Sequence, residues 1–281
     1  MKVRGVNYNV EIYNGNQGKE RLILLHGFTG STKSWMHVLD HFSQFELILI
    51  DLIGHGQTES PKDVLRYSME EVVNDIKEIM DMLEISHTNM LGYSMGGRVA
   101  LSFTVRFPQY INKLVLESSS PGLNNEEDRI QRIKADTKLA KVIMSSDDLS
   151  HFVRRWEDIP LFKSQKRLPD LVQSRIRHQR LRNSPLGLAN SLMGMGTGVQ
   201  PSLWHELKRI KTPVLLLCGE LDQKFCEIAK QMMQQLENSS KKEIIDVGHA
   251  IHVEQPQIFG KIVNEFLLRN KILNRRNYIG N

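Results

Sequence analysis

Short, continuous apolar runs alternate along this chain with stretches of helical periodicity. Apolar runs bounded by glycine, proline or polar residues are typical of strands buried on both faces of a parallel sheet. We predict strands at residues 5–14, 20–25, 47–50, 113–117, 213–218 and 243–247, and another that ends at Leu91. Amphipathic spacing predicts helices between them, most clearly at 68–84 and 256–273. This alternation favours an α/β fold with a mostly parallel central sheet and helices on both faces.

The alternation of strand and helix stops after residue 122. From there to residue 204 the sequence shows only helical periodicity with many charges, and the strand signal returns at Pro213. We expect the intervening segment to form helices above the carboxyl edge of the sheet. The sequence therefore predicts a core made of residues 1–122 and 205–281, with a helical lid inserted at 123–204.

Composition and charge restrict the class of ligand. The chain has 281 residues, of which 40% are hydrophobic, and a net charge of +5. Residues 123–204 contain 14 basic and 9 acidic residues, so the predicted lid carries the whole excess. Such an excess can serve a nucleic acid, a membrane surface or a small anion. Almost no aromatic residues lie between Phe162 and Trp204 to stack on bases. We therefore expect a small anionic substrate and no nucleic acid partner.

Other partners and cofactors find little support in the sequence. No apolar run approaches the ~20 residues that span a bilayer, and no signal-peptide pattern follows the first residues. We expect a cytoplasmic protein without a membrane partner, either a monomer or a weak homo-oligomer. Cys218 and Cys226 fall in separate predicted elements and suggest no metal or disulfide framework. No metal and no cofactor is expected, because no ligand-spaced cluster and no phosphate-binding glycine motif is found.

A glycine-rich motif, G-x-S-x-G, is formed by Gly92, Ser94 and Gly96. An apolar strand signal precedes it and a helical pattern follows, which is the context of a nucleophile elbow. Such a turn holds the serine hydroxyl at a helix N-terminus, where the N–H of Met95 points toward a developing oxyanion. The motif alone leaves open a glycine-rich turn with an idle serine, so the rest of the chain must decide.

Two further residues complete a catalytic pattern with Ser94. Asp222 and His249 each follow a predicted strand, and both come after the serine. The chain order Ser, Asp, His at the carboxyl ends of strands is that of a catalytic triad. His249 would remove the seryl proton, and Asp222 would fix the imidazole tautomer. The alternatives are Glu117, Glu220 and Asp246 for the acid and His252 for the histidine.

The sequence His26-Gly27-Phe28 follows the predicted strand at 20–25. A loop at this place supplies the second oxyanion donor in hydrolases of this architecture, here the backbone N–H of Phe28 beside that of Met95. His26 is expected to brace the loop. His55 comes too early for the triad order and is expected to be structural.

Motifs spread over nearly the full chain resemble the α/β-hydrolase superfamily: His26-Gly27-Phe28, Gly54-His55-Gly56, Gly92 to Arg98, Gly219 to Asp222 and Gly248-His249. Three narrower segments, at 120–123, 180–189 and 194–204, resemble the MenH family within it. This is the family of 2-succinyl-6-hydroxy-2,4-cyclohexadiene-1-carboxylate synthases of bacterial menaquinone biosynthesis. Met193 stands where the family pattern has an arginine.

The resemblance implies a lyase that removes pyruvate from 2-succinyl-5-enolpyruvyl-6-hydroxy-3-cyclohexene-1-carboxylate. Ser94, deprotonated by His249, would then take a carbon-bound proton. Because the substrate carries several carboxylates, arginine forks are suited to bind it. The expected substrate-binding residues are Tyr93, Arg98, Arg132, Trp156 and Arg180, with Arg129 as the competitor of Arg132. The alternative is a serine hydrolase, either a carboxylesterase or a carbon–carbon bond hydrolase, that acts on a small anionic substrate.

Overall fold

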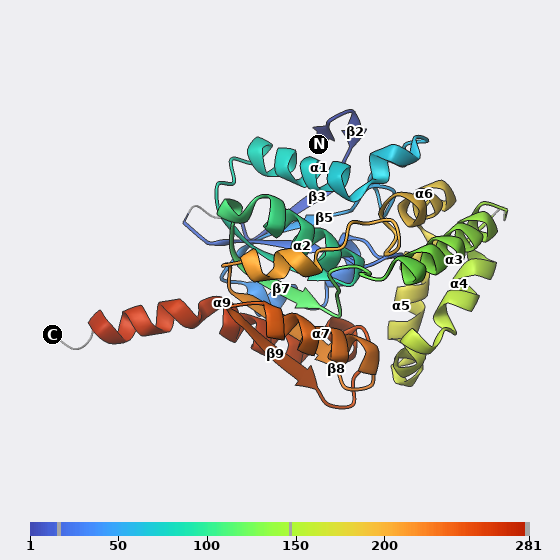
Figure 1. Ribbon diagram of the computed structural model, residues 1–281. Helices are drawn as coiled ribbons and strands as arrows, with labels where there is room; N and C mark the ends of the chain where they lie inside the picture. The colour runs from blue at the N-terminus through green and yellow to red at the C-terminus, as the bar shows by residue number, and fades with distance from the viewer. Residues whose placement is uncertain (16–17, 146–147, 279–281) are drawn as a thin grey trace.

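The computed structural model describes residues 1–15, 18–145 and 148–278 (Figure 1). Within this part of the chain, seven strands form one sheet in the order β3-β5-β4-β6-β7-β8-β9. Only β3 runs antiparallel to its neighbour, so the predicted mostly parallel sheet is confirmed. The strands are β3 (Val10–Tyr13), β4 (Arg21–Leu25), β5 (Glu46–Ile50), β6 (Thr88–Tyr93), β7 (Ile111–Glu117), β8 (Val214–Gly219) and β9 (Ser239–Ile244). A separate antiparallel pair joins β1 (Lys2–Val3) to β2 (Val6–Asn7).

Successive side chains of each buried strand enter two different cores, because strand side chains alternate between the faces of a sheet. In β4, for example, Ile23 and Leu25 belong to one core and Leu22 and Leu24 to the other. The first core is covered by α1 (Met69–Met82), α2 (Met95–Arg106) and α7 (Gln223–Gln235). The second is covered by the short 3-10 helices η1 (Thr32–Trp35) and η2 (Leu39–Phe42) and by α9 (Pro256–Tyr278). Helices therefore cover both faces.

Between β7 and β8 the chain forms a group of helices beside the carboxyl ends of the strands, drawn green to yellow in Figure 1. They are α3 (Glu126–Met144), α4 (Ser150–Glu157), η5 (Pro160–Arg167), α5 (Asp170–Leu181) and α6 (Pro185–Met195). Apolar residues of α3, α4 and α6 pack into a small core of their own, which includes Ile143, Phe152 and Leu192. The remaining short helices are η3 (Val64–Tyr67), η4 (Pro108–Tyr110), η6 (Trp204–Arg209) and α8 (Ile251–Glu254).

The corner between α5 and α6 is tied to the loops of the sheet. Asn183 accepts a hydrogen bond from the N–H of Gly56 at 3.0 Å and donates one to the carbonyl of Thr29 at 2.9 Å. Gly187 approaches Gly54 so closely that a Cβ on Gly187 would lie 2.1 Å from the Gly54 carbonyl oxygen. The inserted helices are thus held at one end by backbone contacts that larger residues would prevent.

Two predicted strands differ from the structure. The segment predicted at 5–14 is divided between β2 and β3, with Gly5 at φ +89° in the turn before β2. The strand predicted at 243–247 lies earlier, as β9, and Asp246 occupies a turn with φ 57°. β9 is an edge strand that pairs only with β8 and exposes much of its side-chain surface. Its polar sequence therefore gave no apolar signal, and the prediction shifted to the apolar residues that follow it.

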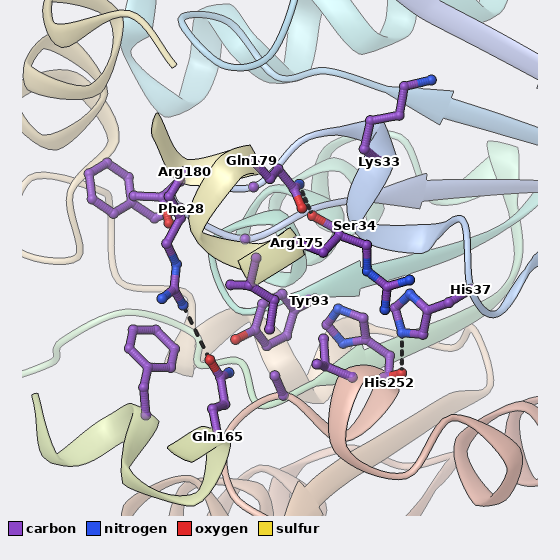
Figure 2. A pocket seen from close by; sticks show the side chains of 17 residues that line it. Phe28, Lys33, Ser34, His37, Tyr93, Gln165, Arg175, Gln179, Arg180 and His252 are labelled. Atoms are coloured by element: carbon purple, nitrogen blue, oxygen red, sulfur yellow. Dashed lines mark hydrogen bonds between the residues drawn. The ribbon is translucent and has the colours of Figure 1, made fainter. Parts of the chain in front are cut away.

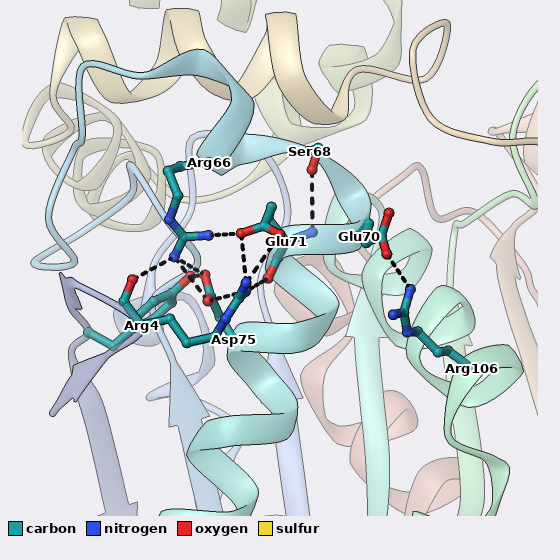
Figure 3. Close-up of polar contacts among 8 residues, drawn as sticks. Arg4, Arg66, Ser68, Glu70, Glu71, Asp75 and Arg106 are labelled. Carbon is teal, nitrogen blue, oxygen red and sulfur yellow. Dashed lines mark hydrogen bonds and ion pairs between the residues drawn. The ribbon is translucent and has the colours of Figure 1, made fainter.

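A charged cluster fastens the N-terminal strands to α1 (Figure 3). Asp75 is fully buried and accepts hydrogen bonds from Arg4 and Arg66 at 3.0 Å and from the Tyr8 hydroxyl at 2.7 Å. Burial raises the pKa of Asp75, and the two arginines oppose that rise. Ser68 caps α1 through its bond to the N–H of Glu71. No helix of the described residues has the length and apolar character needed to cross a bilayer.

Candidate active site

Ser94 lies at the sharp turn between β6 and α2, with φ 52° and ψ −107°. A non-glycine residue in this region is strained, and such strain is found at functional turns. The turn is tight because a Cβ on Gly92 would lie 2.4 Å from the Gly96 carbonyl oxygen, and one on Gly96 would lie 2.2 Å from that of Leu25. The sequence-predicted strand, turn and helix therefore occur in that order around the serine.

The structure brings Ser94, Asp222 and His249 into one hydrogen-bonded chain. The Nε2 atom of His249 lies 2.9 Å from the Ser94 Oγ, and its Nδ1 atom lies 2.6 Å from the Asp222 Oδ2. His249 and Asp222 are both buried. Asp222 precedes α7 after β8, and His249 follows the turn after β9. With Nδ1–H donated to Asp222, Nε2 is free to take the seryl proton.

The rival acids and the rival histidine make other contacts. Glu220 accepts a bond from the backbone N–H of Asp246 at 2.9 Å. Glu117 and His252 are fully buried and bond to each other at 2.9 Å through Nδ1 of the histidine. Two of the four alternatives for the triad, Glu117 and His252, therefore form a separate histidine–carboxylate pair.

The proposed oxyanion donors lie on either side of Ser94. Met95 is the first residue of α2, and Phe28 follows Gly27 after β4. Neither backbone N–H has a protein acceptor among the described residues. Gly27 must be small, because a Cβ there would lie 2.6 Å from the Tyr93 ring. Both amides are thus free to donate to a bound oxygen.

His26 and His55 make the contacts of structural residues. The His26 ring bonds the Gly27 carbonyl through Nδ1 at 2.8 Å and accepts from the Leu52 N–H through Nε2 at 3.0 Å. Burial lowers the pKa of His26 to about 4, and burial, with a smaller contribution from His26, lowers that of His55 to about 3. Both rings are therefore neutral at pH 7 and hold the loops after β4 and β5.

Arg98 lies on α2 and Arg132 on α3, and neither lines the cavity that contains Tyr93 and Arg180. Arg98 donates to the Met195 carbonyl at 2.6 Å and to the Gln200 side chain. Burial, and then the charge of Arg132, lower the pKa of Arg98 to about 10. Arg132 bonds both oxygens of Asp136 through Nε at 2.9 Å, and its side chain is 40% exposed. The two guanidinium groups are thus close enough to repel, an arrangement that a bound anion would relieve.

Arg180 lies on α5 and lines the cavity that contains Tyr93. Its guanidinium lies 4.7 Å from the centre of the Phe162 ring and 3.4 Å from Glu157, and it is 7% exposed. It also donates to the side chain of Gln165 at 3.3 Å (Figure 2). Burial lowers the pKa of Arg180, and the charge of Glu157 opposes the change.

Two aromatic residues, Tyr93 and Trp156, pack against residues of the candidate site. The Tyr93 ring packs against His249 at 5.4 Å between centres, and burial raises the pKa of its hydroxyl well above the usual value. The Trp156 ring packs edge-on against Phe28 at 5.4 Å. Its Nε1 is buried without an acceptor among the described residues. An N–H left in this state is available to a ligand oxygen, since buried donors are rarely left unpaired.

Several residues of the site had no signal in the sequence. Gln165 and Gln200 hold Arg180 and Arg98, and the Nε2 of Gln200 is itself buried without a partner in the described chain. Arg175 and His37 line the same cavity as Tyr93 and Arg180 (Figure 2). Only the excess of basic residues at 163–182 pointed toward this part of the lid.

One group of side chains could hold a metal ion among the residues that the structure describes. The sulfur atoms of Cys218 and Cys226 and a carboxylate oxygen of Glu243 lie within 4.8 Å of one another. Burial raises the pKa of both thiols, which disfavours the thiolates that bind metals. Glu243 is also paired with Lys241 at 2.8 Å. The two cysteines are thus neighbours, although their elements are separate in the sequence.

Comparison with known proteins defines the family. A family model described as alpha/beta hydrolase fold matches residues 20–256. A Bacillus subtilis (strain 168) protein, provisionally named 2-succinyl-6-hydroxy-2,4-cyclohexadiene-1-carboxylate synthase, is 48% identical over 94% of this chain and 95% of its own length. The synthase of that name from Photorhabdus laumondii subsp. laumondii is 30% identical over 91% of this chain and 88% of its own. The chain belongs to this synthase family, the MenH family of α/β hydrolases.

A solved structure supports the same assignment. MenH from S. aureus superimposes on this chain with a TM-score of 0.89 at 38% sequence identity. The match covers 93% of this chain and 98% of that one, so it includes the inserted helices as well as the sheet. The resemblance inferred from the sequence motifs is therefore confirmed at the level of the MenH family.

Proposed function

We propose that the protein is a lyase of menaquinone biosynthesis that converts 2-succinyl-5-enolpyruvyl-6-hydroxy-3-cyclohexene-1-carboxylate to 2-succinyl-6-hydroxy-2,4-cyclohexadiene-1-carboxylate and pyruvate. The observation that supports it best is the match to the MenH family over nearly the full length of the protein. The protein also has the hydrogen-bonded triad Ser94–His249–Asp222. The arginines assigned to substrate binding favour a substrate with several carboxylates.

In this mechanism the serine acts as a base. Ser94 passes its proton to Nε2 of His249, and its oxygen takes a proton from a ring carbon of the substrate. The electron pair of the C–H bond at C2 forms a C2=C3 double bond, the C3=C4 pair of the substrate moves to C4=C5, and the C–O bond from C5 to the enolpyruvyl group breaks. The leaving oxygen keeps the bonding pair as an enolate, which takes up a proton to become pyruvate. The imidazolium of His249, stabilised by Asp222, is the nearest proton donor.

The negative charge that develops on the substrate during proton removal is stabilised by fixed donors. The backbone N–H groups of Phe28 and Met95 have no other acceptor in the described chain and are suited to this task. We assign carboxylate binding to Arg98, Arg132 and Arg180, and contacts with the ring to Tyr93 and Trp156. The ligand is thus a small polyanion.

A coupled assay tests this function directly. The precursor made by the preceding pathway enzyme is supplied, and pyruvate release is followed with a dehydrogenase. We expect release that depends on the protein and is saturable. Absence of pyruvate release above the spontaneous rate would contradict the proposed lyase.

A serine hydrolase is the second candidate, because a Ser94 Oγ at 2.9 Å from Nε2 of His249 is equally suited to nucleophilic attack. In that case an anionic ester or a carbon–carbon bond would be cleaved through an acyl-enzyme. The basic lid is compatible with an acidic ester. The two candidates differ in whether Ser94 becomes covalently modified.

A further inference from the structure

A cavity lies next to the triad residue His249, with the Tyr93 ring in contact with both. Tyr93 and Phe28 line it, and Tyr93 also packs against His249 at 5.4 Å. Among the described residues that line it are Lys33, Arg175 and Arg180, together with the rings of His37 and His252, but no Asp or Glu (Figure 2). A concave surface with cations and no carboxylate attracts an anion.

Arg175 is the cation of this cavity that no carboxylate of the described residues neutralises. Lys33 is paired with Glu11 at 3.0 Å, and Arg180 lies 3.4 Å from Glu157. The guanidinium of Arg175 makes no hydrogen bond or ion pair with any described residue. Figure 2 shows it beside the His37 ring.

His252 forms part of the wall of the cavity. Its Nδ1–H donates to the buried carboxylate of Glu117 at 2.9 Å, and its backbone N–H donates to the same oxygen at 3.0 Å. These two bonds fix the position of the ring. His37 holds the same turn by donating from Nε2 to the His252 carbonyl at 2.7 Å. Burial, with the nearby His252 and Arg175, lowers the pKa of His37 to about 4, so His37 is neutral.

The cavity has a volume of about 60 Å³. Since one water needs at least ~10–15 Å³ by this measure, it has room for several water molecules. That space admits a carboxylate and the adjoining carbon atoms, so one carboxylate arm of a substrate at Ser94 could enter beside Tyr93.

We propose that this cavity is a second carboxylate subsite, in which Arg175 binds the succinyl arm of the substrate. This inference rests on the proposed function for the identity of the arm. It assigns the positive charge of α5 to substrate binding beyond Arg180.

The test compares Arg175→Ala with Arg182→Ala. Arg182 is an exposed arginine at the end of the same helix, has no ion pair among the described residues and does not line the cavity. We expect Arg175→Ala to raise KM for pyruvate release about tenfold with kcat nearly unchanged, because one charged hydrogen bond is lost in both the ground and transition states. Arg175→Lys should recover part of the loss. Equal KM values for the two alanine variants would overturn the subsite.

A binding measurement separates this inference from the proposed function. Succinate is titrated calorimetrically into the wild-type protein and both variants. We expect succinate to bind the wild type and Arg182→Ala alike, and Arg175→Ala about tenfold more weakly. If wild type releases no pyruvate, the proposed function fails while this measurement still decides the subsite. Equal succinate affinity in Arg175→Ala and Arg182→Ala, or no binding to the wild type, would overturn it.

Discussion

At the scale of single residues, the properties of Ser94 depend on its surroundings more than on its own chemistry. A serine hydroxyl is a weak base and nucleophile at neutral pH. Its Oγ is bonded to His249, whose other nitrogen is bonded to a buried Asp222. Because the three act in sequence on one proton, loss of either the serine or the histidine should cost nearly the whole effect.

We therefore predict that Ser94→Ala and His249→Ala each lower turnover by several orders of magnitude and leave the fold intact. Steady-state pyruvate release and circular dichroism would measure the two effects. Ser102→Ala and His87→Ala are suitable controls, because Ser102 bonds only a carbonyl of its own helix and His87 is exposed. A triad variant that keeps more than about a tenth of the wild-type rate would show that the role is wrong.

The arginines also permit a prediction for single side chains. Replacement of Arg98, Arg132 or Arg180 by Ala should raise KM and weaken substrate binding by roughly 1.5–3 kcal/mol, the usual scale for a charged hydrogen bond. Lys should restore only part, since it lacks the bidentate fork. Arg129 is the informative comparison on α3, because it contacts the Val199 carbonyl instead. If Arg129→Ala weakens binding more than Arg132→Ala, the assignment between these two residues is reversed.

At the scale of elements, the elbow depends on close approach of β4, β6 and α2. Gly96→Ala would place a Cβ 2.2 Å from the Leu25 carbonyl oxygen, which is backbone and cannot move aside easily. We expect this change to destabilise the protein by about 1–3 kcal/mol or more, and to lower activity further because Ser94 shifts. Gly15→Ala is the control, since its new contacts are ordinary ones with side chains. Urea unfolding measures the stability of both variants. Equal unfolding midpoints for Gly96→Ala and Gly15→Ala would contradict the prediction.

The contact between the edge strand β3 and η1 gives a prediction about pH. Burial alone would raise the pKa of Glu11, but bonds from Tyr13, Lys33 and Thr32 outweigh it and lower the pKa to about 2. A carboxyl whose pKa is lower in the folded state stabilises the fold above its unfolded pKa, 4.5, and this stabilisation is lost as the pH falls toward 2.

Glu11→Gln should therefore lower the free energy of unfolding at pH 7, by up to about 3 kcal/mol, and should flatten its dependence on pH between about 4.5 and 2. Urea denaturation at a series of pH values measures both effects. Glu78→Gln, at an exposed position of α1 with no ion pair among the described residues, is the matched control. If the free energy of unfolding of Glu11→Gln fell between about pH 4.5 and 2 as steeply as that of the wild type, the prediction would be contradicted.

At the scale of the whole molecule, the candidate site lies where the inserted helices meet the carboxyl ends of the strands. The sheet and its loops supply Ser94, His249 and the proposed oxyanion donors, and the inserted helices supply Arg132, Trp156 and Arg180. In the proposed function the core therefore carries out proton transfer, and the inserted helices, together with Arg98 of α2, bind the substrate. A lyase and a hydrolase can share this arrangement, so the distinction must come from the chemistry at Ser94.

Rapid-quench mass spectrometry during turnover makes that distinction. We predict no mass increase on Ser94 with the anionic substrate, and slower turnover of a neutral p-nitrophenyl ester, because a base forms no acyl-enzyme. The neutral ester serves as the comparison in the same experiment. A covalent adduct formed from the anionic substrate, or faster turnover of the ester, would favour the hydrolase.

Much of the fold follows from local sequence patterns. The buried parallel strands and helix α1 could be predicted because their apolar spacing is complete within each segment. β9 could not, because an edge strand forms through backbone bonds to β8 and needs no apolar pattern of its own. Sequence patterns also fail to show which polar side chains of a helix face a ligand. Arg175 and Arg182 have similar sequence surroundings, but of the two only Arg175 lines the cavity that contains Tyr93.

The sequence by itself determined the family, the order of strands and helices, and the residues placed at strand ends, which include Ser94, Asp222 and His249. These features are local, since an elbow or a strand end is specified by a few adjacent residues. The tertiary structure alone decided that Glu117 and His252, which are 135 residues apart, form a pair, and that Arg98 and Arg132 are close neighbours. Such contacts depend on how packed elements meet, and no periodicity along the chain records which charged side chain faces solvent and which faces a ligand.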